Sequence, residues 1–473
     1  MDDLRDRLAR LAQQAAQRAQ APGATLTLRR ARARRRWAAG VGLCLLLLGL
    51  AGVTSRLVAD RKVVNLPAGS ATTVPGTTTL PGATPRQAAP LWTAEAATPA
   101  TVRQQAYQHQ AAGDVVVVAT GVERSGRVGA YDARTGRLRW TRHTGGVSIM
   151  AVGERHVIVA PQYGALIALD LATGEERWRF PLSPRQSSGH GTIVGDSLYI
   201  GTSFPGEGAV DAPVVYSLEL ATGGQRWRAV LDSGTDLEWG APVVENGLVL
   251  VADTLSHSGS APASHLHALD AGTGQGRWKA DLHSNQQGFH NQRPIVAGGT
   301  VVVMNTSGTL LGLAADSGRE LWRQRLGEKL RLLVGVKAGL IVAALEGGLV
   351  AFEVESGDRR WEAPVPRGRW ATEPWAVLAE GTVYVAAGGH VGAFSVATGA
   401  VRWRAATGQA IGPPVTAGAR LYVATGDRLV ALDAISGRAA WVSANLEIAI
   451  PPVATQRGVA ITTRGGALLG FAP

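Results

Sequence analysis

The side chains best suited to chemistry gather around two long insertions, SFPGEGAVDAP (203–213) and TLSHSGSAPASH (254–265). Histidines with Asp and Glu nearby could bind a metal ion. Aromatic residues beside carboxylates favour a groove for a peptide or a glycan over a bare metal site. An inert, solvated surface is the third interpretation, because loops collect polar residues in any case. The candidate binding face comprises His190, Asp236, Glu238, Trp239, His257, His265, His283, His290, Arg293, Trp370 and Trp375.

Signatures of established catalytic sites are absent from the sequence. It contains no His-Glu-x-x-His, no Gly-x-Ser-x-Gly and no Walker-type loop. GTGQG at 272–276 resembles a phosphate-binding loop, but it falls inside a repeated turn. The single cysteine, Cys44, excludes a disulfide framework, a cysteine-based zinc site, an iron–sulfur cluster and covalently attached haem. We therefore assign no catalytic, cofactor-binding or metal-binding residue and expect no cofactor.

The elements that must position the candidate face come from an internal repeat. An eleven-residue pattern such as ALDLATGEERW occurs eight times, with Gly four residues before Trp and Thr or Ser just before that Gly. The eight patterns end at Trp140, Trp178, Trp227, Trp278, Trp322, Trp361, Trp403 and Trp441. Each unit has a strand, a tight turn and a second strand, with two more short strands upstream. Four antiparallel strands repeated around an axis predict an all-β propeller, in which each Trp packs between adjacent sheets.

The two ends of the chain are expected to share one sheet. The sequence ends with apolar strands but without a closing Trp strand. LWTAEAA at 91–97 resembles the missing strand, with Trp92 in the Trp position. Such closure would also protect exposed strand edges. With this strand included, the count of units is nine.

The repeat resembles a known family. The form A-x-D-x-x-T-G-x-x-x-W, best kept at 130–140 and 168–178, is similar to the PQQ-type propeller repeat of quinoprotein alcohol dehydrogenases and BamB-like outer-membrane assembly lipoproteins. The resemblance covers residues 91–473 and implies a propeller of four-stranded blades, with eight blades expected from the family. A PQQ-dependent dehydrogenase, by resemblance, needs a vicinal cysteine pair, a calcium site and often a Cys-x-x-Cys-His haem motif. The pair and the haem motif are absent, so we predict a binding protein rather than an enzyme, with the dehydrogenase as the alternative.

The net charge of +11 belongs mainly to residues 1–36, which hold ten Arg and three Asp, so no nucleic-acid partner is expected. Residues 37–55 carry no charge and predict a transmembrane helix. The arginines before this segment place the N-terminus in the cytoplasm and the propeller outside the cell membrane. A cleaved signal peptide is the alternative.

Four regions follow from these patterns. Residues 1–36 form a cytoplasmic Arg-rich tail, 37–55 a single membrane span, 56–90 a Pro/Thr/Gly-rich linker and 91–473 the propeller. The tail is read as a topology-setting arm, with a short amphipathic helix as the alternative. The predicted function is a membrane-anchored scaffold or ligand-binding module of the bacterial envelope. Its predicted partner is an envelope protein, a peptide or a glycan on one propeller face.

Overall fold

The computed structural model describes residues 85–96, 107–120, 126–145, 147–161, 164–183, 187–203, 213–231, 235–237, 241–255, 263–282, 293–305, 308–327, 330–365 and 374–473. The predicted tail, the predicted span 37–55 and all but the end of the linker lie outside these ranges. No helix in the described ranges is long and apolar enough to cross a membrane. The described strands belong to one compact unit, Pro75–Pro473.

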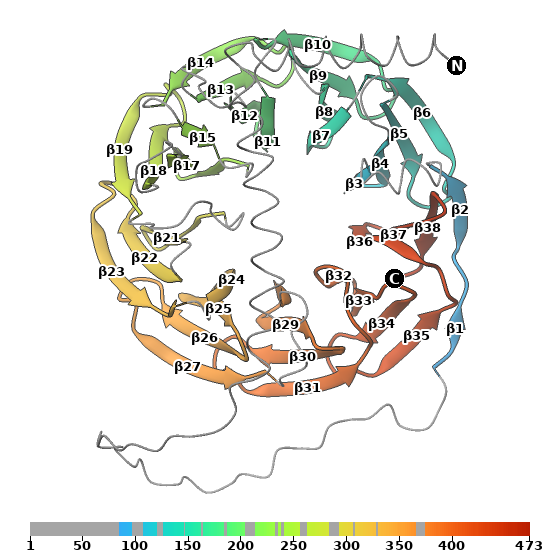
Figure 1. Ribbon diagram of the computed structural model, residues 1–473. Coiled ribbons are helices and arrows are strands. Elements are labelled where there is room, and N and C mark those ends of the chain that lie inside the picture. Colours follow the sequence, from blue (N-terminus) through green and yellow to red (C-terminus); the bar gives the residue numbers. More distant parts are fainter. Residues whose placement is uncertain are drawn as a thin grey trace, which may run out of the picture. The chain divides into compact units, whose positions relative to one another are not determined.

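Within this unit the described strands form nine sheets that follow one another around a ring (Figure 1). Sheet 1 contains β3 (Tyr107–Ala112), β4 (Val115–Thr120), β5 (Arg127–Asp132) and β6 (Leu138–His143). Sheet 2 contains β7 (Val147–Val152), β8 (His156–Pro161), β9 (Ala165–Asp170) and β10 (Glu176–Pro181). Sheet 3 contains β11 (Ser187–Val194), β12 (Ser197–Ser203), β13 (Val214–Glu219) and β14 (Gln225–Val230). Sheet 4 contains β15 (Thr235–Leu237), β16 (Val243–Glu245), β17 (Leu248–Leu255), β18 (Ala263–Asp270) and β19 (Gly276–Asp281).

The remaining sheets continue around the ring in sequence order. Sheet 5 contains β20 (Ile295–Ala297), β21 (Thr300–Met304), β22 (Thr309–Ala314) and β23 (Glu320–Arg325). Sheet 6 contains β24 (Leu330–Lys337), β25 (Leu340–Leu345), β26 (Gly348–Glu353) and β27 (Arg359–Pro364). Sheet 7 contains β28 (Trp375–Ala379), β29 (Thr382–Ala387), β30 (His390–Ser395) and β31 (Val401–Ala406). Sheet 8 contains β1 (Gln87–Ala88), β32 (Val415–Ala417), β33 (Arg420–Ala424), β34 (Leu429–Asp433) and β35 (Ala439–Ser443), and sheet 9 contains β2 (Trp92–Glu95), β36 (Ile448–Thr455), β37 (Gly458–Thr463) and β38 (Ala467–Phe471).

The middle strands of each sheet are buried on both faces. β4, with the sequence VVVVAT, is buried along its whole length. The outermost strands instead alternate, and in β10 only Trp178 is fully buried. Apolar residues run continuously where neighbouring sheets cover both faces of a strand, and they alternate where one face meets solvent. The core is therefore divided into apolar layers between adjacent sheets.

Eight of the nine interfaces between the described sheets are linked by a tryptophan from one sheet and a glycine from the next. The indole N–H of Trp140 donates a hydrogen bond to the carbonyl of Leu171, at 2.9 Å. Its ring lies against Gly174, where an added Cβ would overlap the indole. Gly174 has a φ of +73°, which favours glycine for a second reason. In eight sheets the indole N–H of the repeated tryptophan donates to a backbone carbonyl of the following sheet. These tryptophans are Trp92, Trp140, Trp178, Trp227, Trp278, Trp322, Trp361 and Trp403.

The predicted closure of the ring by the N-terminal segment is confirmed. β2 pairs antiparallel with β38, and Trp92 lies opposite Gly470. β1 adds a parallel strand to β35, a pairing that the repeat pattern does not predict. The prediction of nine units from the strand count is confirmed for the described residues. The expectation of eight blades, which came from the family resemblance, is wrong for this chain.

A half-buried histidine joins the first sheet to the last. His109 of β3 donates from Nε2 to the carbonyl of Pro451 at 2.8 Å, since a carbonyl oxygen only accepts. Its Nδ1 lies 3.2 Å from the hydroxyl of Thr462. Burial lowers the pKa of His109 from 6.5 to about 4, although the hydrogen bond to Pro451 acts in the opposite direction. The neutral imidazole is therefore the form that fits the closed ring.

The contact between tryptophan and glycine predicts a specific loss of stability for Gly174→Ala. Gly247 is a matched control, because its φ is +77° but an added methyl group there meets no atom within 4 Å. We expect Gly247→Ala to cost about 1 kcal/mol from backbone strain alone. Gly174→Ala should cost about 3 kcal/mol because steric overlap with Trp140 is added. Thermal and urea unfolding of the full chain measure both, and equal losses would contradict the packing argument.

The closure by His109 predicts a pH dependence of stability. The pKa of His109 is lower in the folded chain than in the unfolded chain, so protonation favours the unfolded chain. The free energy of unfolding therefore keeps the full contribution of the neutral imidazole above pH 6.5 and loses it as the pH falls from 6.5 towards 4. Between pH 7 and pH 5 we expect this loss to be about 2 kcal/mol. His109→Gln should remove this component, whereas the exposed His390→Gln should leave the profile of the wild type. Identical profiles for His109→Gln and the wild type would contradict this assignment.

Candidate functional site

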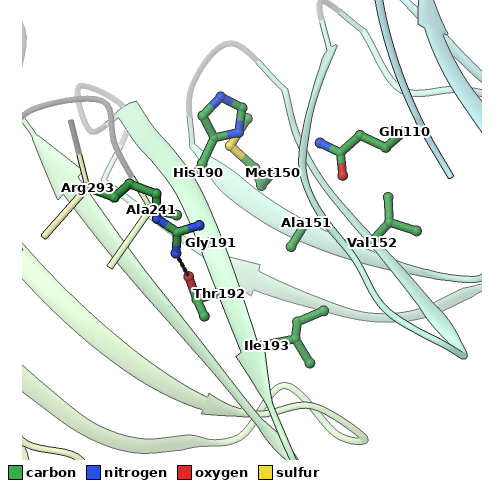
Figure 2. A pocket seen from close by; sticks show the side chains of 10 residues that line it. All are labelled: Gln110, Met150, Ala151, Val152, His190, Gly191, Thr192, Ile193, Ala241 and Arg293. Carbon is green, nitrogen blue, oxygen red and sulfur yellow. Dashed lines mark hydrogen bonds between the residues drawn. The ribbon is translucent and has the colours of Figure 1, made fainter. Parts of the chain in front are cut away.

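A pocket opens at the innermost strands of the first three sheets. It has a volume of about 580 Å³, and Figure 2 shows the side chains around it. β3, β7 and β11 supply most of the lining, and single residues before β16 and β20 complete it. The lining residues are Gln110, Met150, Ala151, Val152, His190, Gly191, Thr192, Ile193, Ala241 and Arg293.

Two strand irregularities contribute side chains to this pocket. In β7 the pairing with β8 shifts between Ile149 and Ala151, so Met150 is an extra residue. In β11 the pairing with β12 shifts between Ser188 and Gly191, a stretch that includes His190. Bulges of this kind turn a side chain away from the direction that regular alternation would give it. The exposed His190 and the buried Met150 therefore reach the pocket from neighbouring sheets.

Arg293 is the cationic group of the pocket. Its guanidinium donates to the hydroxyl of Thr192 at 3.3 Å and to the carbonyl of Pro242 at 3.2 Å (Figure 2 draws the first bond). The hydroxyl of Thr192 in turn donates to the same carbonyl at 2.6 Å. Burial lowers the pKa of Arg293, yet a guanidinium keeps its charge in proteins. Among the residues that the structure describes, no carboxylate forms an ion pair with it.

This arrangement is suited to recognition. Within the part of the chain that the structure describes, both hydrogen bonds of Arg293 come from one terminal nitrogen, which leaves further N–H donors of the guanidinium for a carboxylate or a carbonyl group. Met150, Val152 and Ile193 add apolar surface beside these donors. A few polar groups within an apolar lining are typical of ligand pockets.

Of the candidate-face residues that the structure describes, it brings two together in the pocket, His190 and Arg293. Trp375 begins β28, where it is half-buried and packs against the core between sheets 7 and 8. Asp236 lies in β15, opposite Thr254 of β17. His265 lies in β18, outside the pocket. The other predicted residues, Glu238, Trp239, His257, His283, His290 and Trp370, lie outside the described residues.

His265 belongs to a second polar cluster, and its other members, Asp253 and His267, are not among the predicted candidate residues. Its Nδ1 lies 3.0 Å from Oδ1 of Asp253, and Nε2 of His267 lies 2.6 Å from Oδ2 of the same carboxylate. The signal available in the sequence was the spacing of His265 and His267, because residues two apart on a strand share a face. Asp253 is placed by strand pairing, which the sequence does not specify directly. The pocket residues Gln110, Met150 and Thr192 were missed because their roles depend on contacts between sheets.

A family profile described as outer membrane protein assembly factor BamB matches residues 124–203, 211–377 and 367–472 of the chain. The BamB protein of Moranella endobia is 26% identical over 237 residues, which are 45% of this chain and 56% of that protein. The chain thus spans about half the length of that curated relative.

Two solved structures have a similar fold. The crystal structure of BamB from Moraxella catarrhalis is 21% identical, with 74% of this chain and 98% of that chain covered and a TM-score of 0.46. A quinohemoprotein alcohol dehydrogenase of Pseudomonas putida is 14% identical, with 81% and 72% covered and a TM-score of 0.48. Both similarities concern the propeller fold and do not extend to an activity.

Proposed function

Because the chain belongs to the BamB family of PQQ-type propellers, we propose that it is a protein-binding scaffold of the bacterial cell envelope. The observation that carries the proposal is the pocket at β3, β7 and β11, where Arg293 presents a positive charge beside apolar side chains. A protein segment that supplies a carboxylate or backbone carbonyls would match these donors. A glycan groove at the same place is the alternative ligand class.

The anchoring of the scaffold rests on the sequence. Residues 37–55 would span the cell membrane once, with the Arg-rich tail 1–36 in the cytoplasm and the propeller outside. The linker 56–90 would hold the propeller away from the membrane surface. In this arrangement the pocket is available to envelope proteins.

The scaffold proposal predicts that partners touch the pocket. A photo-crosslinking residue at position 190 of the full chain, expressed in its native envelope, should give discrete protein adducts. The same residue at position 435 is the control, because Ile435 is strongly exposed in the turn between β34 and β35. Arg293→Ala should weaken the adducts at position 190 about 10-fold or more, since a hydrogen bond to a charged group contributes about 1.5–3 kcal/mol. Arg457→Ala, in the turn between β36 and β37, should not change them. The same adducts at position 435, or no effect of Arg293→Ala, would contradict the proposal.

The dehydrogenase alternative predicts a different result. If the propeller held PQQ with calcium, ligand at 100 times its dissociation constant would stabilise the fold by about 2.7 kcal/mol. The scaffold proposal predicts no such stabilisation, because the sequence lacks the vicinal cysteine pair of those enzymes. Calorimetry and thermal unfolding of the full chain with PQQ and Ca²⁺ make the comparison. Micromolar or tighter binding of PQQ would favour the enzyme and justify dye-linked alcohol assays.

A further inference from the structure

A fully buried carboxylate lies at the interface between sheets 3 and 4. Asp253 has no exposed surface and pairs across the ladder with His265, and His267 lies two residues further along β18. These residues continue the face formed by Val251 and Leu269, which packs against sheet 3. A carboxylate oxygen of Asp253, one ring nitrogen of His265 and one ring nitrogen of His267 lie within 4.8 Å of one another. Each atom is an established ligand for a transition-metal ion.

The residues equivalent to Asp253 in other sheets show which side-chain group the fold requires at that position. In sheet 5, Asn305 lies where Asp253 lies in sheet 4, and its Oδ1 accepts a hydrogen bond from the backbone N–H of Thr309 at 2.9 Å. Oδ1 of Asp253 accepts the equivalent bond from His265, also at 2.9 Å.

A hydroxyl performs the same role in sheet 8. There Thr425 accepts a hydrogen bond from the backbone N–H of Arg428 at 3.0 Å. The structural role of the position therefore requires only a neutral oxygen.

The charge and the imidazoles of sheet 4 go beyond that structural role. The positions of His265 and His267 are occupied in sheet 5 by Thr309 and Leu311. A carboxylate buried without a counter-charge is costly. Asp253 is instead a fully buried carboxylate held between two imidazole nitrogens.

We propose that Asp253, His265 and His267 form a Zn²⁺ site that links β17 and β18. The ligands would be one oxygen of Asp253, Nδ1 of His265 and Nε2 of His267, with each ring proton kept on the other nitrogen. Tetrahedral ligands about 2.0–2.2 Å from zinc lie about 3.4 Å apart. At present the two nitrogens contact different oxygens of Asp253, Nδ1 of His265 at 3.0 Å from Oδ1 and Nε2 of His267 at 2.6 Å from Oδ2. Both contacts are shorter than this spacing and must widen to admit the ion. Three protein ligands leave a fourth position for water or for a group of a bound partner.

The surroundings include an approach to the site and two opposing charges. His267 lines a hollow of about 380 Å³ together with Leu231 and Lys279. On the facing strand β19, Lys279 lies opposite His267 and Asp281 lies opposite His265. Asp281 favours a cation here, and Lys279 opposes it. The long side chain of Lys279 can move its charge away from the site.

The first test uses the full chain after treatment with EDTA and exchange into metal-free buffer. Titration calorimetry should show one Zn²⁺ per chain with a dissociation constant in the micromolar range or below, together with a rise in melting temperature. Co²⁺ should give the visible absorption bands of a tetrahedral site. Ca²⁺ should have neither effect, because it prefers oxygen ligands. Failure of the wild type to bind Zn²⁺, or a preference for Ca²⁺, would overturn the proposal.

The matched variant follows from sheet 5. Asp253→Asn, His265→Thr and His267→Leu together reproduce Asn305, Thr309 and Leu311, a combination that the chain already accommodates. We expect this triple variant to keep its circular dichroism spectrum and to bind Zn²⁺ at least 100-fold more weakly. His390→Gln, at an exposed histidine in another sheet, should bind as the wild type does. Unchanged affinity in the triple variant would overturn the proposal, and neither outcome depends on the partner of the Arg293 pocket.

Discussion

The hydrogen bond from a tryptophan indole to the next sheet is the contact on which the ring depends. It links one sheet to the next, because in eight of the nine interfaces between the described sheets the indole also lies against the turn glycine of the following sheet. The Gly and the Trp within one repeat therefore serve different interfaces, although they are only four residues apart. A side chain at Gly174 would displace the indole of Trp140, and the carbonyl of Leu171 would lose its donor. This coupling explains why Thr-Gly or Ser-Gly and Trp recur together while the residues between them vary.

Sheet 9, which closes the ring, has the tryptophan hydrogen bond at its interface with sheet 1 and a different contact at its interface with sheet 8. The N-terminal strand β2 brings Trp92 into sheet 9, from which its indole reaches the carbonyl of Ala133 in sheet 1. Between sheets 8 and 9, Trp441 stacks on Phe471 with ring centroids 5.4 Å apart. Sheet 9 lacks the repeated glycine turn, so an aromatic partner fills the interface instead. Closure therefore needs residues from both ends of the propeller.

Periodicity made the fold predictable, and departures from periodicity limited the prediction of the site. Nine units and the role of LWTAEAA followed from the position of Trp92, because that position recurs. The parallel pairing of β1 with β35 left no periodic signal. The bulge at Met150 depends on a register shift, and the contact of Arg293 with Thr192 joins segments about one hundred residues apart. Neither property can be read from one repeat.

The repeats also separate structural polar groups from polar groups available for binding. A neutral side chain is enough to accept the backbone hydrogen bond at the end of the second strand, as Asn305 and Thr425 show. Asp253 keeps that bond and adds a charge that the fold does not require. The charged side chain of Arg293 likewise lies in a connection between sheets, where the repeat imposes no residue type. Both departures lie in the same part of the ring, around sheets 3 to 5. In a fold whose stability is spread over nine similar interfaces, such exceptions are where selection for binding can act without disturbing the ring.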